Sequence, residues 1–588
     1  MADSAIASYK TSPELSKAWA GLASWRALET NFGLGEQFLS IWHAWKNDPK
    51  APRLLHYVGL TDEPTTFEAL SHAARQHPEL QPLLDELKVH WMALLPGFHR
   101  IVLNDGQVLL TLCIGELTKL LRDQQFETDS VFLNPGTSIT ALSDVWNSWT
   151  VKALARCCYR GTLVSLSPSA LPLHSELKAC GFQFDASSLW GVFNPHWEIK
   201  RSRGAFNLTT ESVGTCAVIG AGLAGASLAA ALAKRGWQVQ VLDTAPLSAA
   251  GASGLPVGLV VPHVSVDDCA QSRLSRSGVR LMLQQARHLL RRGQDWADTG
   301  VLEKQLDGTK DLAQRAIFHQ QAAWLKPTQL VRAWLAQPGV RFTGNCEVAS
   351  LKKQSNEWLL LDGEGHEIGR AQQVVFANAG GALPLLEAMQ AEEPRLNLNR
   401  LPPVHGMRGL LSWGLHASAP EAANANFPTL PVNGSGSVIP WIPVEPESNS
   451  NAVSKQAWYV GSSYQVDKQP ELADAVNHLA NLERLKQLMP ELGENLTPVF
   501  QSEQVQHWKN TRCVTLDRLP LVGPLYEADH PSLWICAGMG SRGMSFSVLC
   551  AELLAAQWGN EPLPVGAALA RSLFALRGRG LQAPSPQD

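Results

Sequence analysis

The sequence predicts an α/β protein with two nucleotide-binding domains in one chain of 588 residues. Strands alternate with helices up to about residue 190, and a strand, glycine turn, helix and second strand follow over residues 216–243. Another strand, glycine-rich turn and helix over 533–559 predicts a return to the same cofactor site. We therefore expect a Rossmann-like domain of the methyltransferase type, then a dinucleotide-binding Rossmann domain with an inserted, mostly antiparallel α+β substrate domain.

Three glycines in G-x-G-x-x-G spacing, Gly220, Gly222 and Gly225, follow the short apolar run 217–219. The first allows a tight turn, the second lets a pyrophosphate approach the backbone, and the third lets helix and strand pack closely. The helix that follows directs unpaired N–H groups at the phosphates. Asp243 ends the next strand, where an acid accepts ribose hydroxyls and repels a 2′-phosphate. The pattern favours NAD or FAD over NADP; the alternative is a tightly packed helix without a ligand.

Composition narrows the class of protein further. The chain is 45% hydrophobic, which is enough for several cores, and its net charge of −4 gives no global basic field. Its 10 cysteines lack metal-ligand spacing and suit a reducing compartment. The sequence contains no signal-peptide pattern and no apolar run long enough to span a membrane. We expect a cytoplasmic protein without a metal and without membrane association.

The predicted domains are 1–190, a linker over 191–213, and 214–580, with the substrate domain inserted within about 300–510 and a disordered tail over 581–588. In the first domain, the turn containing Gly33 and Gly35 resembles a second nucleotide turn, and residues 143–158 are expected to form one helix. Three basic residues of the linker are consistent with a solvated segment or with a nucleic-acid contact. They are Lys200, Arg201 and Arg203.

A predicted helix over 273–292 is rich in arginine. Several of its arginines are spaced three, four or seven residues apart, so they can share one face. Such a stripe could track a phosphate backbone, although a solvated helix face is the more common explanation. The arginines are Arg273, Arg276, Arg280, Arg287, Arg291 and Arg292.

Five motifs together resemble the FAD-dependent oxidoreductases of the D-amino-acid oxidase type. They are GAGLAG (220–225), VLD (241–243), GASG (251–254), TRCVTLDRLPLVG (511–523) and GMGSRGMSFSVLCAELLAAQ (538–557). They are most similar to the C-terminal half of the MnmC family, bifunctional proteins that make 5-methylaminomethyl-2-thiouridine at the wobble position of tRNA. The resemblance implies that the flavin half removes the carboxymethyl group from carboxymethylaminomethyl-uridine. It implies that the N-terminal half then methylates the amine with S-adenosylmethionine.

The resemblance implies FAD as the cofactor and tRNA as the macromolecular partner. It assigns residues on three loops and one strand end to FAD. These residues are Gly220, Gly222, Gly225, Asp243, Gly251, Ser253, Gly254, Gly538, Gly540, Ser541 and Gly543.

The N-terminal half departs from the family pattern. The family's cofactor loop reads roughly GFGTGLNFL, whereas residues 31–39 read NFGLGEQFL, with Asn31 at the first glycine. The family's ribose acid aligns with Thr61, and the leading acid of a later motif aligns with Asn134. Glu116 remains as an adenine-side acid. We expect a degenerate methyltransferase-like domain that either still transfers a methyl group from S-adenosylmethionine or serves packing or tRNA docking.

The implied reaction is oxidation of a CH–NH bond in a secondary amine that carries a carboxymethyl group. The flavin accepts a hydride from the glycine-like carbon, and water releases glyoxylate from the imine. Positioning and a cation for the carboxylate dominate such chemistry. Three arginines are candidates for that cation, although each could instead be structural: Arg542, Arg408 and Arg512.

Two other functions remain open at this stage. One is a free amino-acid oxidase that acts on glycine or sarcosine without RNA, which a tRNA-binding assay would distinguish. The other is a non-catalytic tRNA-binding protein, which would be colourless when purified.

Overall fold

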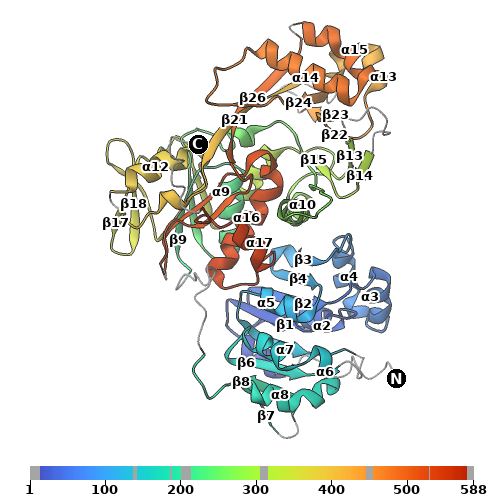
Figure 1. Cartoon of the computed structure of the whole chain (residues 1–588), viewed down its shortest axis with the longest axis vertical. Coiled ribbons are helices and arrows are strands. Elements are labelled where there is room, and N and C mark those ends of the chain that lie inside the picture. Colours follow the sequence, from blue (N-terminus) through green and yellow to red (C-terminus); the bar gives the residue numbers. More distant parts are fainter. Residues whose placement is uncertain are drawn as a thin grey trace, which may run out of the picture. The chain divides into compact units, whose positions relative to one another are not determined.

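The computed structural model (Figure 1) describes 13–136, 142–185, 188–199, 213–304, 316–391, 393–444, 455–502, 504–528 and 530–578. The chain falls into two compact units, one of residues 1–211 with 555–571 and one of residues 212–554 with 572–588. Most of the predicted linker, residues 200–212 with its basic cluster, lies outside the described residues, as does the predicted tail 581–588.

The first unit contains an eight-stranded sheet in the order β3-β4-β2-β1-β5-β6-β8-β7. Its central strands β4, β2, β1, β5 and β6 are parallel, while β3, β8 and β7 pair antiparallel at the edges. The strands are β1 (Ser24–Glu29), β2 (Leu54–Thr61), β3 (Gly97–Leu103), β4 (Val108–Ile114), β5 (Thr128–Leu133), β6 (Cys158–Leu166), β7 (Phe182–Phe184) and β8 (Trp190–Phe193). Buried aliphatic and aromatic side chains form a core on each face of this sheet.

Helices lie between most of the strands of this unit, as expected for an α/β domain. They are α1 (Pro13–Trp19), α2 (Glu36–Asn47), α3 (Phe67–Ala73), α4 (Gln81–Lys88), α5 (Leu117–Asp123), α6 (Leu142–Val145), α7 (Ser148–Ala155) and α8 (His174–Ala179). The single helix expected over 143–158 is wrong. The Asn147 side chain accepts hydrogen bonds from the N–H groups of Trp149 and Thr150, which starts α7 afresh after α6.

A late segment of the chain, residues 555–571, completes the first unit. Arg26 Nη1 donates to the Asn560 carbonyl at 3.1 Å, and Arg100 donates to the Pro562 carbonyl. Arg26 also forms a two-contact ion pair with Asp129, at 2.9 Å and 2.8 Å. These contacts join β1, β3 and β5 to a segment more than 400 residues later, which no local pattern in the sequence indicates.

The second unit is built on a six-stranded sheet in the order β16-β10-β9-β20-β28-β27. All neighbours are parallel except β27, which is antiparallel to β28. The strands are β9 (Thr215–Ile219), β10 (Gln238–Leu242), β16 (Val340–Thr343), β20 (Gln373–Phe376), β27 (Leu521–Pro524) and β28 (Leu533–Ala537). Both predicted strand–turn–helix segments are present, because α9 (Leu223–Lys234) follows β9 and α16 (Gly543–Gly559) follows β28. Between β9 and β28 lies β20, which comes from a third part of the chain.

The inserted domain is a mixed sheet in the order β14-β13-β22-β23-β24-β21-β25, with β26 paired to β21. Its pairs are antiparallel except β13 with β22, as expected for a mostly antiparallel substrate domain. The strands are β13 (Val301–Lys304), β14 (Ala316–His319), β21 (Val404–Leu415), β22 (Val432–Gly434), β23 (Gly436–Val444), β24 (Lys455–Gly461), β25 (Gln465–Val466) and β26 (Gln506–Thr515). Two helices, α14 (Asp474–Leu488) and α15 (Pro490–Gln501), bury their apolar faces with side chains of β22, β23 and β24 (Figure 1).

The remaining elements of the second unit cover or extend these sheets. Two small sheets have the orders β11-β15-β12 and β17-β18-β19. The elements are β11 (Gly258–Val260), α10 (Ala270–Leu289), β12 (Trp296–Ala297), β15 (Ala323–Leu325), α11 (Pro327–Leu335), β17 (Ser350–Gln354), β18 (Glu357–Leu361), β19 (Glu367–Ala371), α12 (Ala382–Met389) and α13 (Glu421–Asn426). The last helix of the chain, α17 (Ala567–Ser572), lies mainly in the first unit. Within the described ranges, no helix combines the length and hydropathy needed to cross a membrane.

Candidate functional site

The turn after β9 is shaped by glycines that leave no room for a side chain. A Cβ on Gly225 would lie 1.9 Å from the Gly220 carbonyl oxygen, and a Cβ on Gly220 would lie 2.7 Å from the Ala377 carbonyl oxygen at the end of β20. Gly220 also has φ +109°. The first and third glycines of the motif are therefore required by close packing of turn, helix and neighbouring strand.

Two side chains already bind the N–H groups of this turn. Asp243 Oδ2 accepts from the Ala221 N–H at 2.7 Å, and Ser253 Oγ accepts from the Leu223 N–H at 2.9 Å. A Cβ on Gly222 would lie 2.9 Å from the same Ser253 oxygen. The structure thus places the predicted loop 251–254 and the strand-end acid against the glycine turn.

The second glycine-rich turn lies against the first. Gly543, which begins α16, lies beside Leu223, which begins α9, because a Cβ on Gly543 would be 3.6 Å from Leu223 Cδ1. Deeper in the pair of helices, Ser227 Oγ donates to the Ser547 carbonyl at 3.1 Å. Two helix N-termini therefore meet at one edge of the sheet, which favours an anionic ligand there.

Asn378 lies directly after β20, between these two turns. Its side-chain Oδ1 is buried and has no hydrogen-bond partner among the described residues. A buried acceptor without a donor is costly, so it indicates a ligand that supplies one. The glycine cradle, the two helix N-termini and this acceptor fit a dinucleotide such as FAD.

Two of the three predicted catalytic arginines lie on opposite faces of one sheet. In the β21/β26 ladder, Arg408 pairs with Thr511, and Met407 pairs with Arg512. Because side chains alternate along a strand, Thr511 and Arg512 point to opposite faces. Gly409 makes room on the second face, since a Cβ there would lie 2.4 Å from Arg512 Nη2.

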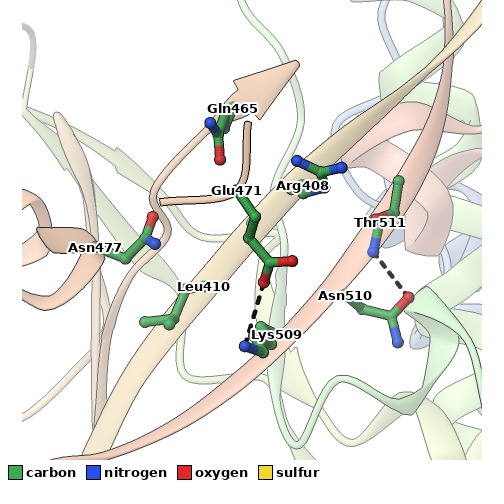
Figure 2. A pocket seen from close by; sticks show the side chains of 9 residues that line it. Arg408, Leu410, Gln465, Glu471, Asn477, Lys509, Asn510 and Thr511 are labelled. Carbon is green, nitrogen blue, oxygen red and sulfur yellow. Dashed lines mark hydrogen bonds and ion pairs between the residues drawn. The ribbon is translucent and has the colours of Figure 1, made fainter. Parts of the chain in front are cut away.

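The face that carries Arg408 lines a pocket within the inserted domain. Figure 2 shows Arg408, Leu410, Lys509 and Thr511 around this pocket. The Arg408 guanidinium donates to the carbonyls of Asp467 and Gln469, both at 2.8 Å. These contacts hold the loop after β25.

Lys509, on the same face, is also held by neighbours. It forms ion pairs with Glu471 at 3.3 Å and Asp474 at 3.1 Å, the first of which is drawn in Figure 2. The cations of this pocket are therefore already engaged within the domain.

The face that carries Arg512 borders both cofactor loops. Trp508, on this face, lies next to the loop 251–254, since a Cβ on Gly254 would be 3.9 Å from Trp508 Nε1. Further along the same face of β26, the Val514 side chain lies next to the second glycine-rich turn, since a Cβ on Gly540 would be 3.9 Å from Val514 Cγ1. Arg512 is therefore the predicted arginine of β26 or β21 that faces the cofactor site.

Arg512 contacts Tyr464, which links it to a second arginine. The Arg512 guanidinium lies 4.8 Å from the centre of the Tyr464 ring, and the Arg484 guanidinium lies 5.2 Å from it. Desolvation raises the pKa of the Tyr464 phenol, but the charge of Arg512, hydrogen bonds from Ser462 and Arg512, and the charge of Arg484 outweigh it, so the pKa lies below its usual 10.0. Arg484 comes from α14 and was not identified from the sequence.

Arg542, the remaining predicted arginine, lies in the second glycine-rich turn and is partly buried. Desolvation lowers its pKa, and the negative charge of Glu303 partly offsets this effect. Glu303 is hydrogen-bonded to His319 at 2.6 Å, which holds the pKa of its carboxyl below the usual value. Arg542 therefore sits in an electrostatic cluster with an acid that sequence analysis did not single out.

In the first unit, the predicted positions gather at the carboxyl ends of the central strands. Gly33 and Gly35 have φ +50° and +73°, and Gly35 caps α2. The Thr30 hydroxyl accepts from the Asn134 N–H at 3.0 Å. A Cβ on Gly136 would lie 3.1 Å from Asn31 Nδ2. This edge is where α/β sheets bind ligands.

The other candidates of the first unit make local contacts. Glu116 caps α5 by accepting from the Thr118 N–H at 3.1 Å, and it also pairs with Lys119 at 3.3 Å. Thr61, at the proposed ribose-acid position, donates to the Glu63 carbonyl at 2.6 Å.

One acid at this edge of the sheet was not identified from the sequence. Glu29 ends β1, is 3% exposed, and accepts from the Tyr57 hydroxyl at 2.8 Å. Desolvation raises its pKa to about 8, against the lowering effect of that hydrogen bond. An acid directly after an apolar strand was the available signal, but the sequence does not show that the side chain turns inward.

The predicted arginine stripe on α10 is not a continuous cationic face. Arg276 pairs with Asp268, Arg291 with Asp295, and Arg292 with Asp298; the last two arginines lie beyond the helix. Burial lowers the pKa of Arg280 to about 10. Of the predicted arginines that lie on α10, only Arg273 and Arg287 are exposed.

The fold and both glycine turns define an FAD-dependent oxidoreductase joined to a methyltransferase-type domain. The sequence model of the FAD dependent oxidoreductase family matches residues 215–309 and 302–557, which is more than half of the chain. The model of an S-adenosyl-L-methionine-dependent methyltransferase family matches residues 78–191, beyond the Gly33–Gly35 turn. FAD is thus the cofactor of the second unit, and the predicted fold class is confirmed.

The chain belongs to the MnmC family. The tRNA 5-methylaminomethyl-2-thiouridine biosynthesis bifunctional protein MnmC of Albidiferax ferrireducens is 53% identical over 584 residues, which cover 96% of this chain and 94% of that protein. The protein of the same name from Polaromonas naphthalenivorans is 43% identical over 596 residues, which cover 94% of this chain and 90% of that protein. A solved glycine oxidase from Geobacillus kaustophilus aligns with a TM-score of 0.48 and 18% identity, covering 62% of this chain and 98% of that chain.

Proposed function

We propose that the protein modifies the wobble uridine of tRNA by FAD-dependent oxidation of the CH–NH bond in 5-carboxymethylaminomethyl-(2-thio)uridine. The products are the aminomethyl nucleoside and glyoxylate. Family membership over 96% of the chain supports the tRNA substrate. The observation that carries the proposal is the meeting of both glycine turns with the Arg512 face of β26, because it joins a dinucleotide cradle to a cation for a carboxylate.

FAD, when bound, accepts the hydride that leaves the carbon next to the nitrogen. The chain's own residues bind and orient the cofactor and the substrate. Asp243, Ser253 and the glycines of both turns would hold the cofactor, and Arg512 would hold the substrate carboxylate through charge-assisted hydrogen bonds. Arg542, at the second turn, would add positive charge beside the cofactor. Arg408 has a different role in this proposal, since it holds the loop after β25.

Methyl transfer by the first unit is the second candidate function. The match of residues 78–191 to a methyltransferase family and the word bifunctional in the relatives' names support it. The replacements at Asn31, Thr61 and Asn134 count against it, because they remove the loop glycine and two acids that the family pattern carries. S-adenosylmethionine would be the methyl donor if this function is retained.

The deciding experiment is mass spectrometry of wobble nucleosides after incubation of the purified yellow protein with carboxymethylaminomethyl-modified tRNA. Aminomethyl product with and without S-adenosylmethionine would support oxidation alone. Methylaminomethyl product that appears only with S-adenosylmethionine would add the second function. Unchanged tRNA, together with oxidation of glycine or sarcosine, would replace the proposal by a free amino-acid oxidase.

A further inference from the structure

The guanidinium groups of Arg484 and Arg512 both lie near the Tyr464 ring, with no carboxylate between them. Their guanidinium groups lie 5.2 Å and 4.8 Å from the centre of the Tyr464 ring. Among the described residues, the side-chain contacts of these arginines are to Ser462 and Tyr464, and none is to a carboxylate. Several other arginines of this unit are paired with an acid, as Arg276 is with Asp268 at 2.6 Å.

The backbone of the neighbouring loop holds both arginines in place. Arg512 Nη2 donates to Ser462 Oγ at 3.0 Å, and Arg484 Nη1 donates to the Ser462 carbonyl at 3.2 Å. Each contact uses one guanidinium nitrogen, so further donors of both side chains are available. Partly buried guanidinium groups that repel each other need an anion to offset their desolvation.

The two arginines reach Tyr464 from different elements. Arg512 comes from the face of β26 that borders the cofactor loops, whereas Arg484 comes from α14, which covers the sheet beyond it (Figure 1). The substrate offers a single carboxylate, which Arg512 is placed to take. Arg484 therefore requires a second anion.

We propose that Arg484 binds a backbone phosphate of the RNA next to the modified nucleotide, with Tyr464 as the ring that positions both guanidinium groups. An exposed aromatic ring beside arginine is the usual combination for single-stranded RNA, in which bases stack and phosphates pair with cations. Tyr464 is 50% exposed, which leaves part of its ring open to a base. The inference rests on the proposed function and specifies how the site distinguishes RNA from a free amine.

The test compares two substrates that carry the same reacting group. One is tRNA with 5-carboxymethylaminomethyl-uridine, and the other is the 5-carboxymethylaminomethyl-uridine nucleoside, which has no phosphate. Arg484→Gln should lower kcat/KM for the tRNA about tenfold, mainly through KM, and leave the nucleoside reaction within about twofold. The slope of log affinity against log salt for tRNA should fall by about 0.7.

Two further variants control for charge and for folding. Arg484→Lys should keep the salt slope, because the charge remains, and recover part of the tRNA affinity. Arg332→Gln removes an exposed arginine of α11 and should change neither substrate's kinetics. Flavin absorbance per protein should stay the same in all three variants.

Equal losses on tRNA and nucleoside would overturn the inference, because Arg484 would then act on the shared carboxylate or on the fold. An unchanged tRNA KM and salt slope in Arg484→Gln would overturn it as well. A wild-type protein that oxidises the nucleoside or sarcosine, but never the tRNA, would instead refute the proposed function before any variant is compared.

Discussion

The glycine turn after β9 and the glycine turn after β1 look alike in sequence but differ in what their glycines do. After β9, a Cβ on Gly225 would lie 1.9 Å from a carbonyl oxygen, so space requires glycine. After β1, Gly33 has no described atom within 4 Å of a built Cβ, and only its φ of +50° favours glycine. Close packing on backbone atoms marks the turn after β9, whereas the Gly33 position of the turn after β1 needs only a left-handed backbone.

The acids at the strand ends of the two units also differ in what they contact. Asp243 accepts from the Ala221 N–H in the turn itself, at 2.7 Å. In the first unit, Glu29 turns inward to Tyr57, and the aromatic ring of Phe32 packs over Gly59 instead. The flavin unit thus presents polar groups to its turn, while the N-terminal unit fills the corresponding region with buried side chains. A glycine motif alone does not separate these two outcomes.

The largest expected effect is loss of the cofactor when a side chain is introduced at Gly225, in the glycine turn after β9. Gly225→Val would force the helix away from β9, because its Cβ has no room beside the Gly220 carbonyl. We expect flavin absorbance per protein to fall to roughly a tenth or less, or the protein to become insoluble. Gly363→Ala, at a position with no described atom within 4 Å, is the control and should stay yellow. A fully yellow Gly225→Val protein would contradict the packing argument.

The next largest effect separates the two faces of β21 and β26. Arg512→Gln should lower kcat/KM about a hundredfold, because a charge-assisted contact to the substrate is lost. Arg408→Gln should lower it by no more than about threefold, since Arg408 binds the carbonyls of Asp467 and Gln469. Steady-state kinetics with flavin content as the control would measure both. Equal losses would mean that the loop after β25, and not the face of the sheet, determines activity.

A smaller effect concerns the buried acid of the N-terminal unit. The pKa of Glu29 is raised from its usual 4.5 to about 8, so between these values the folded state holds a proton that the unfolded state has released. The free energy of unfolding therefore falls as pH rises from about 4.5 to 8. Glu29→Gln removes this loss and should stabilise the unit by roughly 3 kcal/mol at pH 7, with little change at pH 4.5. Thermal unfolding at both pH values would check the sign, and greater stabilisation at the lower pH would refute it.

The smallest effect tests the open glycine of the first unit. Gly33→Asn should cost less than about 1 kcal/mol, because asparagine tolerates a left-handed backbone and the position has room. Gly33→Ala should cost more, by roughly 1 kcal/mol, since alanine lacks that tolerance. Denaturant unfolding would measure the difference. A cost for Gly33→Asn as severe as that of Gly225→Val would show that the two turns are equivalent after all.

Sequence patterns predicted the order of strands and helices because these depend on neighbours along the chain. The apolar run before Gly220, the small-residue helix after it and the strand ending at Asp243 are all where the periodicity places them. The expected helix over 143–158 fails at Asn147, whose side chain binds backbone N–H groups and restarts the helix. The dinucleotide class of the second unit also follows from local motifs, since the glycines at 220–225 and the strand-end acid Asp243 lie close together in the sequence. The choice of FAD came from the resemblance to the family.

The site needed tertiary structure, because strand pairing decides which side chains share a face. Arg408 and Arg512 were equal candidates in the sequence, and the register of Met407 with Arg512 separated them. Arg484 reaches Tyr464 from a helix whose position over the sheet no local pattern encodes. The sequence by itself therefore determined the elements, the glycine turns and the cofactor class. Only the fold decided which charges meet, because contacts between distant segments depend on packing and register and not on spacing along the chain.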